Sequence, residues 1–175
     1  MKTRELVTDA MLAAMCAVLG YLAIDTGSIK ITFESLPVLL GGFLFGPLDG
    51  AIIGGVGTLI YQLLRYGVSI TTALWILPYV LAGLLCGAAA KRSGYGTDRG
   101  TVAVFTVLAE LLITLCNTGT LWLDSRIFGY WFPGFIAGSL FVRLILCAVK
   151  GAAFAAVLPG LLRAVGRITG RKEDN

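Results

Sequence analysis

Two pairs of polar residues, each separated by seven positions, interrupt the apolar segments in the second half of the chain. Glu110 and Asn117 form one pair, and Arg143 and Lys150 form the other. Seven residues correspond to two helical turns, so each pair lies along one face of its helix. Ionisable groups in lipid are costly and usually face a partner, a cavity or a ligand. These four residues are therefore the first candidates for an internal ion pair or a binding site.

The composition identifies the surroundings of these residues as a membrane. Of 175 residues, 57% are hydrophobic and 14% are charged, which lies outside the range of ordinary soluble domains. A hydrocarbon layer of ~30 Å needs ~20 apolar residues per helix, so the chain has room for about six spans. No separate soluble domain fits beside them. We therefore expect one membrane domain that covers residues 1–175.

The apolar segments predict an all-α integral membrane protein with six transmembrane helices. The expected helices are Glu5–Ile24, Ile31–Gly46, Leu48–Leu64, Ile70–Ala90, Gly100–Leu123 and Phe135–Arg163. The second and third are short, and a helix of 16 residues extends only about 24 Å. We expect that these two helices do not fully cross the bilayer as straight rods.

The distribution of Lys and Arg predicts the orientation of the helices. Nine of the fourteen cations fall in the N-terminal segment, in the loop between the fourth and fifth helices, or in the C-terminal tail. The positive-inside rule makes this side cytoplasmic, so the N- and C-termini are both expected inside the cell. The net charge of +4 follows from this topology and gives no reason to expect a nucleic-acid partner.

The chain lacks the residue sets of common enzymes and metal sites. It has no histidine, which removes the usual His-dependent nucleophiles and the HExxH zinc motif. Its four cysteines form no CxxC pair, so no zinc or redox site is indicated. We expect neither catalytic activity nor a cofactor.

The antiparallel arrangement of the last two helices places the polar pairs level with each other. Glu110 is expected beside Lys150 near the midplane, where a structural ion pair is the economical interpretation. Asn117 is expected level with Arg143, about two turns below the outer surface. No carboxylate of these two helices lies at that level. An arginine held there could receive the carboxylate or polar ring of a ligand that enters from outside.

Other polar and aromatic residues are expected near the depth of Arg143, at the outer ends of the helices. Such a cavity suits a flat, polar, anionic molecule of vitamin size. For the aromatic residues, an ordinary interfacial belt is the alternative interpretation. The further candidates for substrate binding are Lys30, Glu34, Gln62, Arg65, Tyr66, Trp75 and Trp122.

Two segments and one further residue carry a resemblance to a known family. The run IKITFESLPVLLGGFLFGPLDGAIIG at 29–54, the segment NTGTLWL at 117–123 and Arg143 resemble the substrate-binding S components of energy-coupling factor (ECF) vitamin transporters. Among these, the chain is most similar to the folate-type members. The resemblance covers nearly the whole chain, and the chain length and the number of spans also match those of the family.

The resemblance implies a function without catalysis in the plasma membrane of a prokaryote. An S component captures a vitamin from outside and docks onto a transmembrane coupling subunit that two ATPase subunits drive. Docking uses small residues four apart on the first helix, here Ala10 with Ala14 and Ala13 with Ala17. Small residues at this spacing allow close helix contact in lipid. Packing inside the protein is the alternative role for this alanine-rich helix.

Two positions depart from the folate-type pattern and leave other substrates open. Folate-type members often carry Gly in place of Glu34, and Lys150 is not typical of their last helix. Glu34 could accept hydrogen bonds from the amino groups of a pterin, or it could select another vitamin or a nucleobase-like precursor. A small ion- or proton-coupled carrier, with Glu110 as its proton site, is a further alternative, as is a structural subunit of a larger complex.

Overall fold

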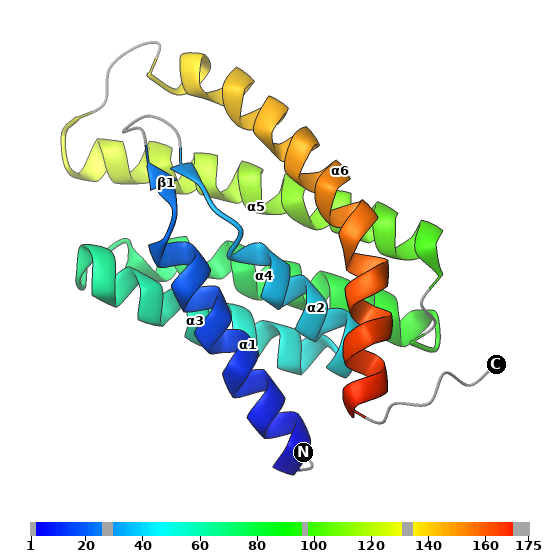
Figure 1. Cartoon of the computed structure of the whole chain (residues 1–175). Coiled ribbons are helices and arrows are strands. Elements are labelled where there is room, and N and C mark those ends of the chain that lie inside the picture. Colours follow the sequence, from blue (N-terminus) through cyan, green and yellow to red (C-terminus); the bar gives the residue numbers. More distant parts are fainter. Residues whose placement is uncertain (1–2, 26–29, 96–97, 131–134, 170–175) are drawn as a thin grey trace.

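The described residues form a bundle of six helices in which successive helices alternate in direction (Figure 1). The computed structural model describes residues 3–25, 30–95, 98–130 and 135–169, with side chains for 5–23, 31–95, 98–130 and 140–167. The helices are α1 (Thr3–Tyr21), α2 (Ser35–Phe45), α3 (Pro47–Tyr66), α4 (Thr72–Arg92), α5 (Arg99–Ile127) and α6 (Phe135–Thr169). The predicted helical fold class and the order of six helices are confirmed.

The connection between α1 and α2 differs from the expected one. Ile24 and Ile31 were predicted to end one helix and begin the next, but they pair across a short antiparallel ladder of β1 (Ile24–Asp25) and β2 (Lys30–Ile31). The β-branched residues Ile24, Ile31 and Thr32 favour extended backbone over helix at both ends of this connection. α2 therefore begins only at Ser35.

The lengths of α2 and α3 also correct the prediction. α2 has 11 residues and extends only about 16 Å, whereas α3 has 20 residues and extends about 30 Å. Among the described residues, four helices are long and apolar enough to cross a membrane: α3, α4, α5 and most of α6. The expected short length thus fits α2, whereas α3 is longer than predicted and long enough to cross.

Glycines hold α2, α3 and α4 in close contact. A Cβ atom at Gly83 of α4 would lie 2.3 Å from the carbonyl of Gly50 in α3, and one at Gly42 of α2 would lie 2.9 Å from the Gly83 oxygen. Side chains at these positions would meet backbone atoms, which cannot rotate away. In lipid, such close approach replaces the hydrophobic force that joins helices in water.

The alanines of α1 fall on two different faces. Ala13 and Ala17 are each 6% exposed, and this face packs on α3, where a Cβ atom at Gly57 would lie 2.8 Å from the Ala13 oxygen. Ala10 and Ala14 are exposed. The alternative role, packing inside the protein, therefore applies to Ala13 and Ala17, and only Ala10 and Ala14 lie on a free surface.

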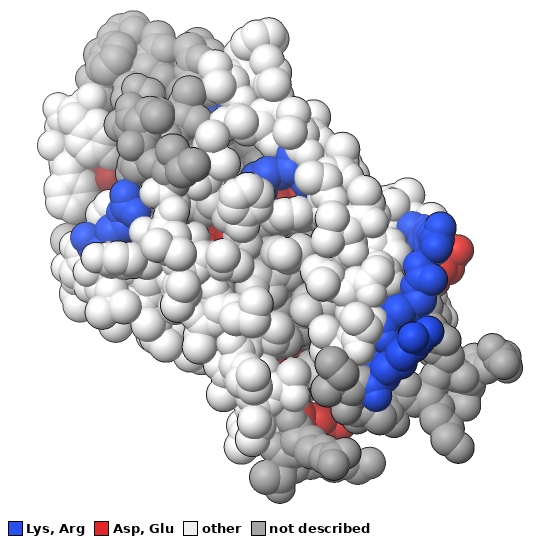
Figure 2. Space-filling view, viewed as in Figure 1, with Lys and Arg blue, Asp and Glu red and all other residues white. Residues whose placement is uncertain are grey.

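The cationic helix ends lie together at one end of the bundle. α4 ends with Lys91 and Arg92, α5 begins at Arg99, and the last turn of α6 contains Arg167. Figure 2 shows Lys and Arg gathered at this end, which is also where α1 begins and α6 ends in Figure 1. This clustering agrees with the charge asymmetry from which the cytoplasmic side was predicted.

Candidate substrate-binding site

A cavity of about 590 Å³ lies at the other end of the bundle, away from the cationic helix ends. Its wall comes from the β2–α2 connection, the end of α3, the start of α4, the second half of α5 and the first half of α6. The volume is that of a typical pocket for a small organic molecule. Twenty-two described residues line it, many of them polar or aromatic.

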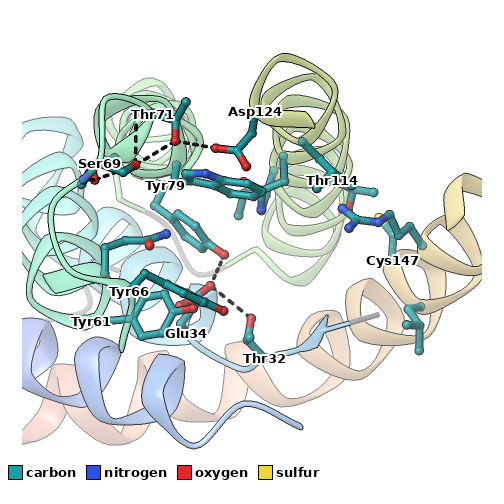
Figure 3. A pocket seen from close by; sticks show the side chains of 18 of the residues that line it. Thr32, Glu34, Tyr61, Tyr66, Ser69, Thr71, Tyr79, Thr114, Asp124 and Cys147 are labelled. Atoms are coloured by element: carbon teal, nitrogen blue, oxygen red, sulfur yellow. Dashed lines mark hydrogen bonds between the residues drawn. The ribbon is translucent and has the colours of Figure 1, made fainter. Parts of the chain in front are cut away.

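A buried cluster around Tyr79 forms one side of the cavity (Figure 3). The Tyr79 hydroxyl donates to Glu34 Oε1, and the Thr32 hydroxyl donates to the same oxygen from 3.2 Å. Tyr79 is 5% exposed and Glu34 is 2% exposed. The second oxygen of Glu34 has no hydrogen-bond partner among the described residues. The cluster fixes the position of a buried carboxylate and leaves half of it unsatisfied.

The innermost charges come from α5 and α6. Lys150 Nζ lies 3.1 Å from Glu110 Oε2, as the seven-residue spacings had suggested. Glu110 is 1% exposed, the Lys150 side chain is 16% exposed, and both line the cavity. Glu110 Oε1 is buried without a hydrogen-bond partner in the described part of the chain. The pair is thus incomplete on its carboxylate side and open on its ammonium side.

Asn117 and Arg143 lie two turns from this ion pair on the same two helices. The Asn117 side chain interacts with the Tyr79 hydroxyl, while its Oδ1 atom is buried without a partner. Arg143 lines the cavity, and its Nε atom is also buried without a partner. No carboxylate among the described residues forms an ion pair with Arg143. An anionic group in the cavity would supply that missing partner.

The mouth of the cavity is organised around Asp124, near the end of α5. Thr71, just before α4, donates to Asp124 Oδ1 from 2.5 Å, and the Tyr130 hydroxyl donates to Asp124 Oδ2. Ser69 is hydrogen-bonded to the Thr71 hydroxyl at 2.9 Å. Tyr130 lies outside the helices. Its partial burial is the main cause, and its interaction with Asp124 the second cause, of a pKa above the ordinary tyrosine value. One carboxylate therefore joins two connections that border the mouth.

The structure brings together six of the nine residues that the sequence suggested for substrate binding. Arg65 does not line the cavity, because its guanidinium donates to the Tyr21 carbonyl of α1 at 2.9 Å. Trp122 is 44% exposed outside the cavity, 5.8 Å from the guanidinium of Arg126. The Lys30 side chain lies outside the described residues. The six that line the cavity are Glu34, Gln62, Tyr66, Trp75, Asn117 and Arg143.

Sequence reasoning did not single out several polar residues of the cavity. Tyr79 follows Trp75 by four residues and Thr71 by eight, so these three share one face of α4 and its N-terminal extension. Asp124 follows Asn117 by seven residues and continues the row that contains Glu110. Both regularities were available in the sequence and could have identified Tyr79, Thr71 and Asp124.

Comparisons with known proteins identify the family. The sequence matches the family "ECF transporter, substrate-specific component" over residues 4–162. The chain belongs to this family. It is therefore an integral membrane S component, a substrate-binding part of a transporter and not an enzyme. A comparison with curated protein sequences finds no match.

Solved structures of other S components share the fold of this one. A biotin S component from an ECF-type ABC transporter is 18% identical, with a TM-score of 0.70 over 93% of this chain and 92% of that one. FolT bound with folic acid is 24% identical, with a TM-score of 0.69 over 91% and 95%. The S component of a bacterial ECF transporter is 20% identical, with a TM-score of 0.66 over 98% and 100%. At these identities, the likeness establishes the fold.

Proposed function

We propose that this S component captures a vitamin, with folate or a related pterin favoured, and delivers it to an ATP-driven coupling module. The binding site is the cavity between α3, α4, α5 and α6. The expected partners are a transmembrane coupling subunit and two ATPase subunits, and the expected location is the plasma membrane of a prokaryote. The protein binds its substrate without changing it chemically.

The main support is the position of Arg143. Its guanidinium lines the cavity but forms no described ion pair, whereas Lys150 on the same helix is already paired with Glu110. An unpaired cation inside a membrane helix is costly, so a positively charged group is retained there for a ligand. A carboxylate satisfies the planar guanidinium with two parallel hydrogen bonds. The substrate therefore carries an acid group.

The rest of the cavity lining favours a flat ring with polar edges. Trp75 and Tyr66 provide aromatic surfaces, and Gln62 provides an amide. Glu34 places a carboxylate in the wall of the cavity, which favours amino groups on the ring. Pterins combine a flat ring, amino groups and, in folate, an acid-bearing tail. Lys30 remains a proposed contact at the mouth.

The charge distribution supports capture from outside the cell. The cationic ends of α4 and α6 lie opposite the cavity, and the positive-inside rule assigns cationic ends to the cytoplasm. The cavity then opens toward the outer surface, and both termini lie inside. A substrate could enter without passing the ion pair of Glu110 and Lys150.

The exposed face of α1 is the proposed docking surface for the coupling subunit. Ala10 and Ala14 lie on this face, one turn apart. Leu6, Met11 and Met15 beside them are each at least 50% exposed and extend the apolar surface. Small residues between larger apolar ones allow the close approach of another helix in lipid.

A binding experiment with Arg143→Ala tests the proposal. Titration of folic acid into the detergent-purified protein is expected to give a Kd for the variant about tenfold to a hundredfold above that of the wild type. Arg126→Ala is the matched control, because Arg126 is exposed outside the cavity, and its Kd is expected to stay within about twofold. Circular dichroism establishes that both variants are folded. Unchanged affinity in folded Arg143→Ala would contradict the assignment.

A further inference from the structure

Charged side chains at the cationic end of the bundle are divided between different helices. The described cations of this end lie on α4, α5 and α6, whereas Asp9 of α1 is 3% exposed and interacts with Asp49 of α3. Figure 2 shows the cations as a strip along one side of the molecule. The positive-inside rule accounts for cations at this end but not for their restriction to these three helices. This cationic strip consists of Lys91, Arg92, Arg99, Arg163 and Arg167.

Close packing of three helix ends forms the strip. α5 packs on both α4 and α6. Ala90 of α4, Val102 of α5 and Leu162 of α6 lie near these ends and belong to one buried cluster. Because buried side chains join the ends, the backbone positions that carry the cations are fixed relative to one another. A fixed backbone lowers the ordering cost for a ligand that contacts several of the cations.

The cations of the strip form no ion pair with the described residues. Four are exposed, and Arg163 is half-buried with its Nε donating to the Pro159 carbonyl at 3.1 Å, which leaves its other N–H groups available. Asp98 directly precedes Arg99, but its carboxylate accepts from the backbone N–H of Thr101 at 3.0 Å and caps α5. The strip therefore concentrates positive charge that an external anion can neutralise.

Helix dipoles explain only part of the strip. Lys91 and Arg92 lie in the last turn of α4 and Arg167 in the last turn of α6, where the partial negative charge of a helix end favours cations. Arg99 is the first residue of α5, where the partial positive charge of the helix end disfavours a cation. A bound anion beside Arg99 would offset that charge and the charges of the neighbouring cations. The position of Arg99 thus favours an anionic ligand.

Apolar surface adjoins the strip on the side of the bilayer centre. Val104 and Val107, in the first three turns of α5, are 57% and 44% exposed, and Val157 of α6 is 51% exposed. A phospholipid carries an anionic phosphate at the end of apolar chains, so its two parts match the strip and the surface below it. An acidic segment of a soluble protein would match the strip alone. The surface therefore fits a lipid better.

We propose that the cationic strip binds the phosphate of an anionic phospholipid in the cytoplasmic leaflet. The chain is an integral membrane S component, and this inference does not depend on which substrate occupies the cavity. The acids that lie on α1 and α3 at this end disfavour the same lipid there. Lipid binding and the proposed docking face of α1 therefore use different helices.

Native mass spectrometry of the detergent-purified protein tests this inference. The probes are phosphatidylglycerol and phosphatidylcholine with identical acyl chains, which differ in headgroup charge, and the measurement is the Kd of the first bound lipid. Each cation near an anionic lipid surface strengthens binding about fivefold, so phosphatidylglycerol is expected to bind at least about tenfold more tightly than phosphatidylcholine. This ratio of the two Kd values is expected to shrink as the salt concentration rises.

Two charge reversals locate the site. Arg167→Glu, in the strip, is expected to reduce the ratio at least about fivefold. Arg126→Glu changes the net charge equally, but Arg126 is exposed at the opposite end of the bundle, and the ratio is expected to stay within about twofold of that of the wild type. Circular dichroism establishes that both variants are folded. If Arg167→Glu does not fold, Arg167→Gln replaces it, with an expected reduction of about threefold to fivefold.

Three results would overturn the inference. The first is equal affinity of the wild-type protein for the two lipids. The second is a preference for phosphatidylglycerol that Arg167→Glu retains or that Arg126→Glu loses to the same extent. The third is an increase in unfolding temperature with inorganic phosphate alone but not with phosphatidylglycerol, which would identify a site for a free anion. If Arg167→Glu keeps the lipid preference but no longer assembles with the coupling module, the strip contacts a protein partner instead of a lipid.

Discussion

Gly54 links the packing of α3 to the position of Tyr79, and its substitution tests the structure most directly. A Cβ atom at Gly54 would lie 2.6 Å from the Tyr79 carbonyl oxygen, whereas ordinary C···O contacts begin at about 3.3 Å. α3 and α4 would therefore have to separate by about 0.7 Å. Overpacking of this kind costs roughly 1–3 kcal/mol of unfolding free energy. The strain falls on the residue that donates to Glu34 in the cavity.

The neighbouring residue provides a matched control. At Gly55, the nearest atom to an added Cβ is Val80 Cγ2 at 3.4 Å, which is an ordinary contact. Replacing Gly by Ala inside a helix stabilises the helix by about 0.5–1 kcal/mol. Because both variants gain this amount, it cancels in the difference between their unfolding free energies. Gly54→Ala should therefore unfold about 1–3 kcal/mol more easily than Gly55→Ala, or about 2–12 °C lower for a chain of this size.

Thermal unfolding in one detergent, followed by circular dichroism, measures this difference. Titration of folic acid adds a second measurement, because displacement of Tyr79 should weaken binding in Gly54→Ala and leave Gly55→Ala unchanged. Equal unfolding temperatures for the two variants would refute the contact between the Gly54 position and the Tyr79 backbone. Unequal temperatures with equal affinities would refute the link between this packing and the cavity.

Three further predictions concern α1 and the start of α5. Ala14→Leu is expected to block vitamin uptake by the assembled transporter in vesicles without changing the Kd for the vitamin, whereas loss of binding would assign this face to the fold. Ala13→Leu is expected to lower the unfolding temperature, because Ala13 packs against α3, and unchanged stability would contradict that contact. Asp98 accepts from the Thr101 backbone N–H at 3.0 Å, which lowers its pKa below the ordinary value. Its stabilising effect is therefore present above about pH 4 and lost as the pH falls through the lowered pKa. Asp98→Ala should lower the unfolding temperature at pH 7 but not at low pH, and Asp98→Asn, which can still cap the helix, should have a smaller effect.

The polar row on each of the last two helices could be predicted from the sequence because helical periodicity fixes which residues share a face. Glu110 and Asn117 line one cavity with Arg143 and Lys150, and the two innermost residues form an ion pair. Antiparallel neighbours joined by a short connection leave few choices of register. The cost of charges in lipid then indicates which residues must face one another.

Periodicity could have marked Tyr79, Thr71 and Asp124 as candidates, but their contacts join segments that are far apart in the chain. Tyr79 occurs in an apolar run of α4, and nothing local indicates that its hydroxyl reaches Glu34, 45 residues earlier. The same holds for Thr71 and Asp124, which are 53 residues apart. Arg65 was predicted in the site from its place at the end of α3, but the free carbonyl at the end of α1 binds its guanidinium instead.

The alanines of α1 illustrate a limit of spacing alone. Residues four apart share a face, so the sequence groups Ala10 with Ala14 and Ala13 with Ala17. It cannot decide which face meets α3. The decision comes from Gly57, because its missing side chain lets Ala13 and Cys16 approach α3 closely.

The row of Glu110, Asn117 and Asp124 along α5 is not parallel to the helix axis. Seven residues of a straight α-helix turn about the helix axis by 20° less than two full turns. The row therefore shifts around the axis by about 40° between Glu110 and Asp124. Its contacts change accordingly, from Lys150 of α6, through Tyr79 within α4, to Thr71 just before α4. Depth along α5 and choice of neighbouring helix are therefore coupled. Moving a carboxylate by one heptad along α5 would change the helix that it contacts as well as its distance from the mouth.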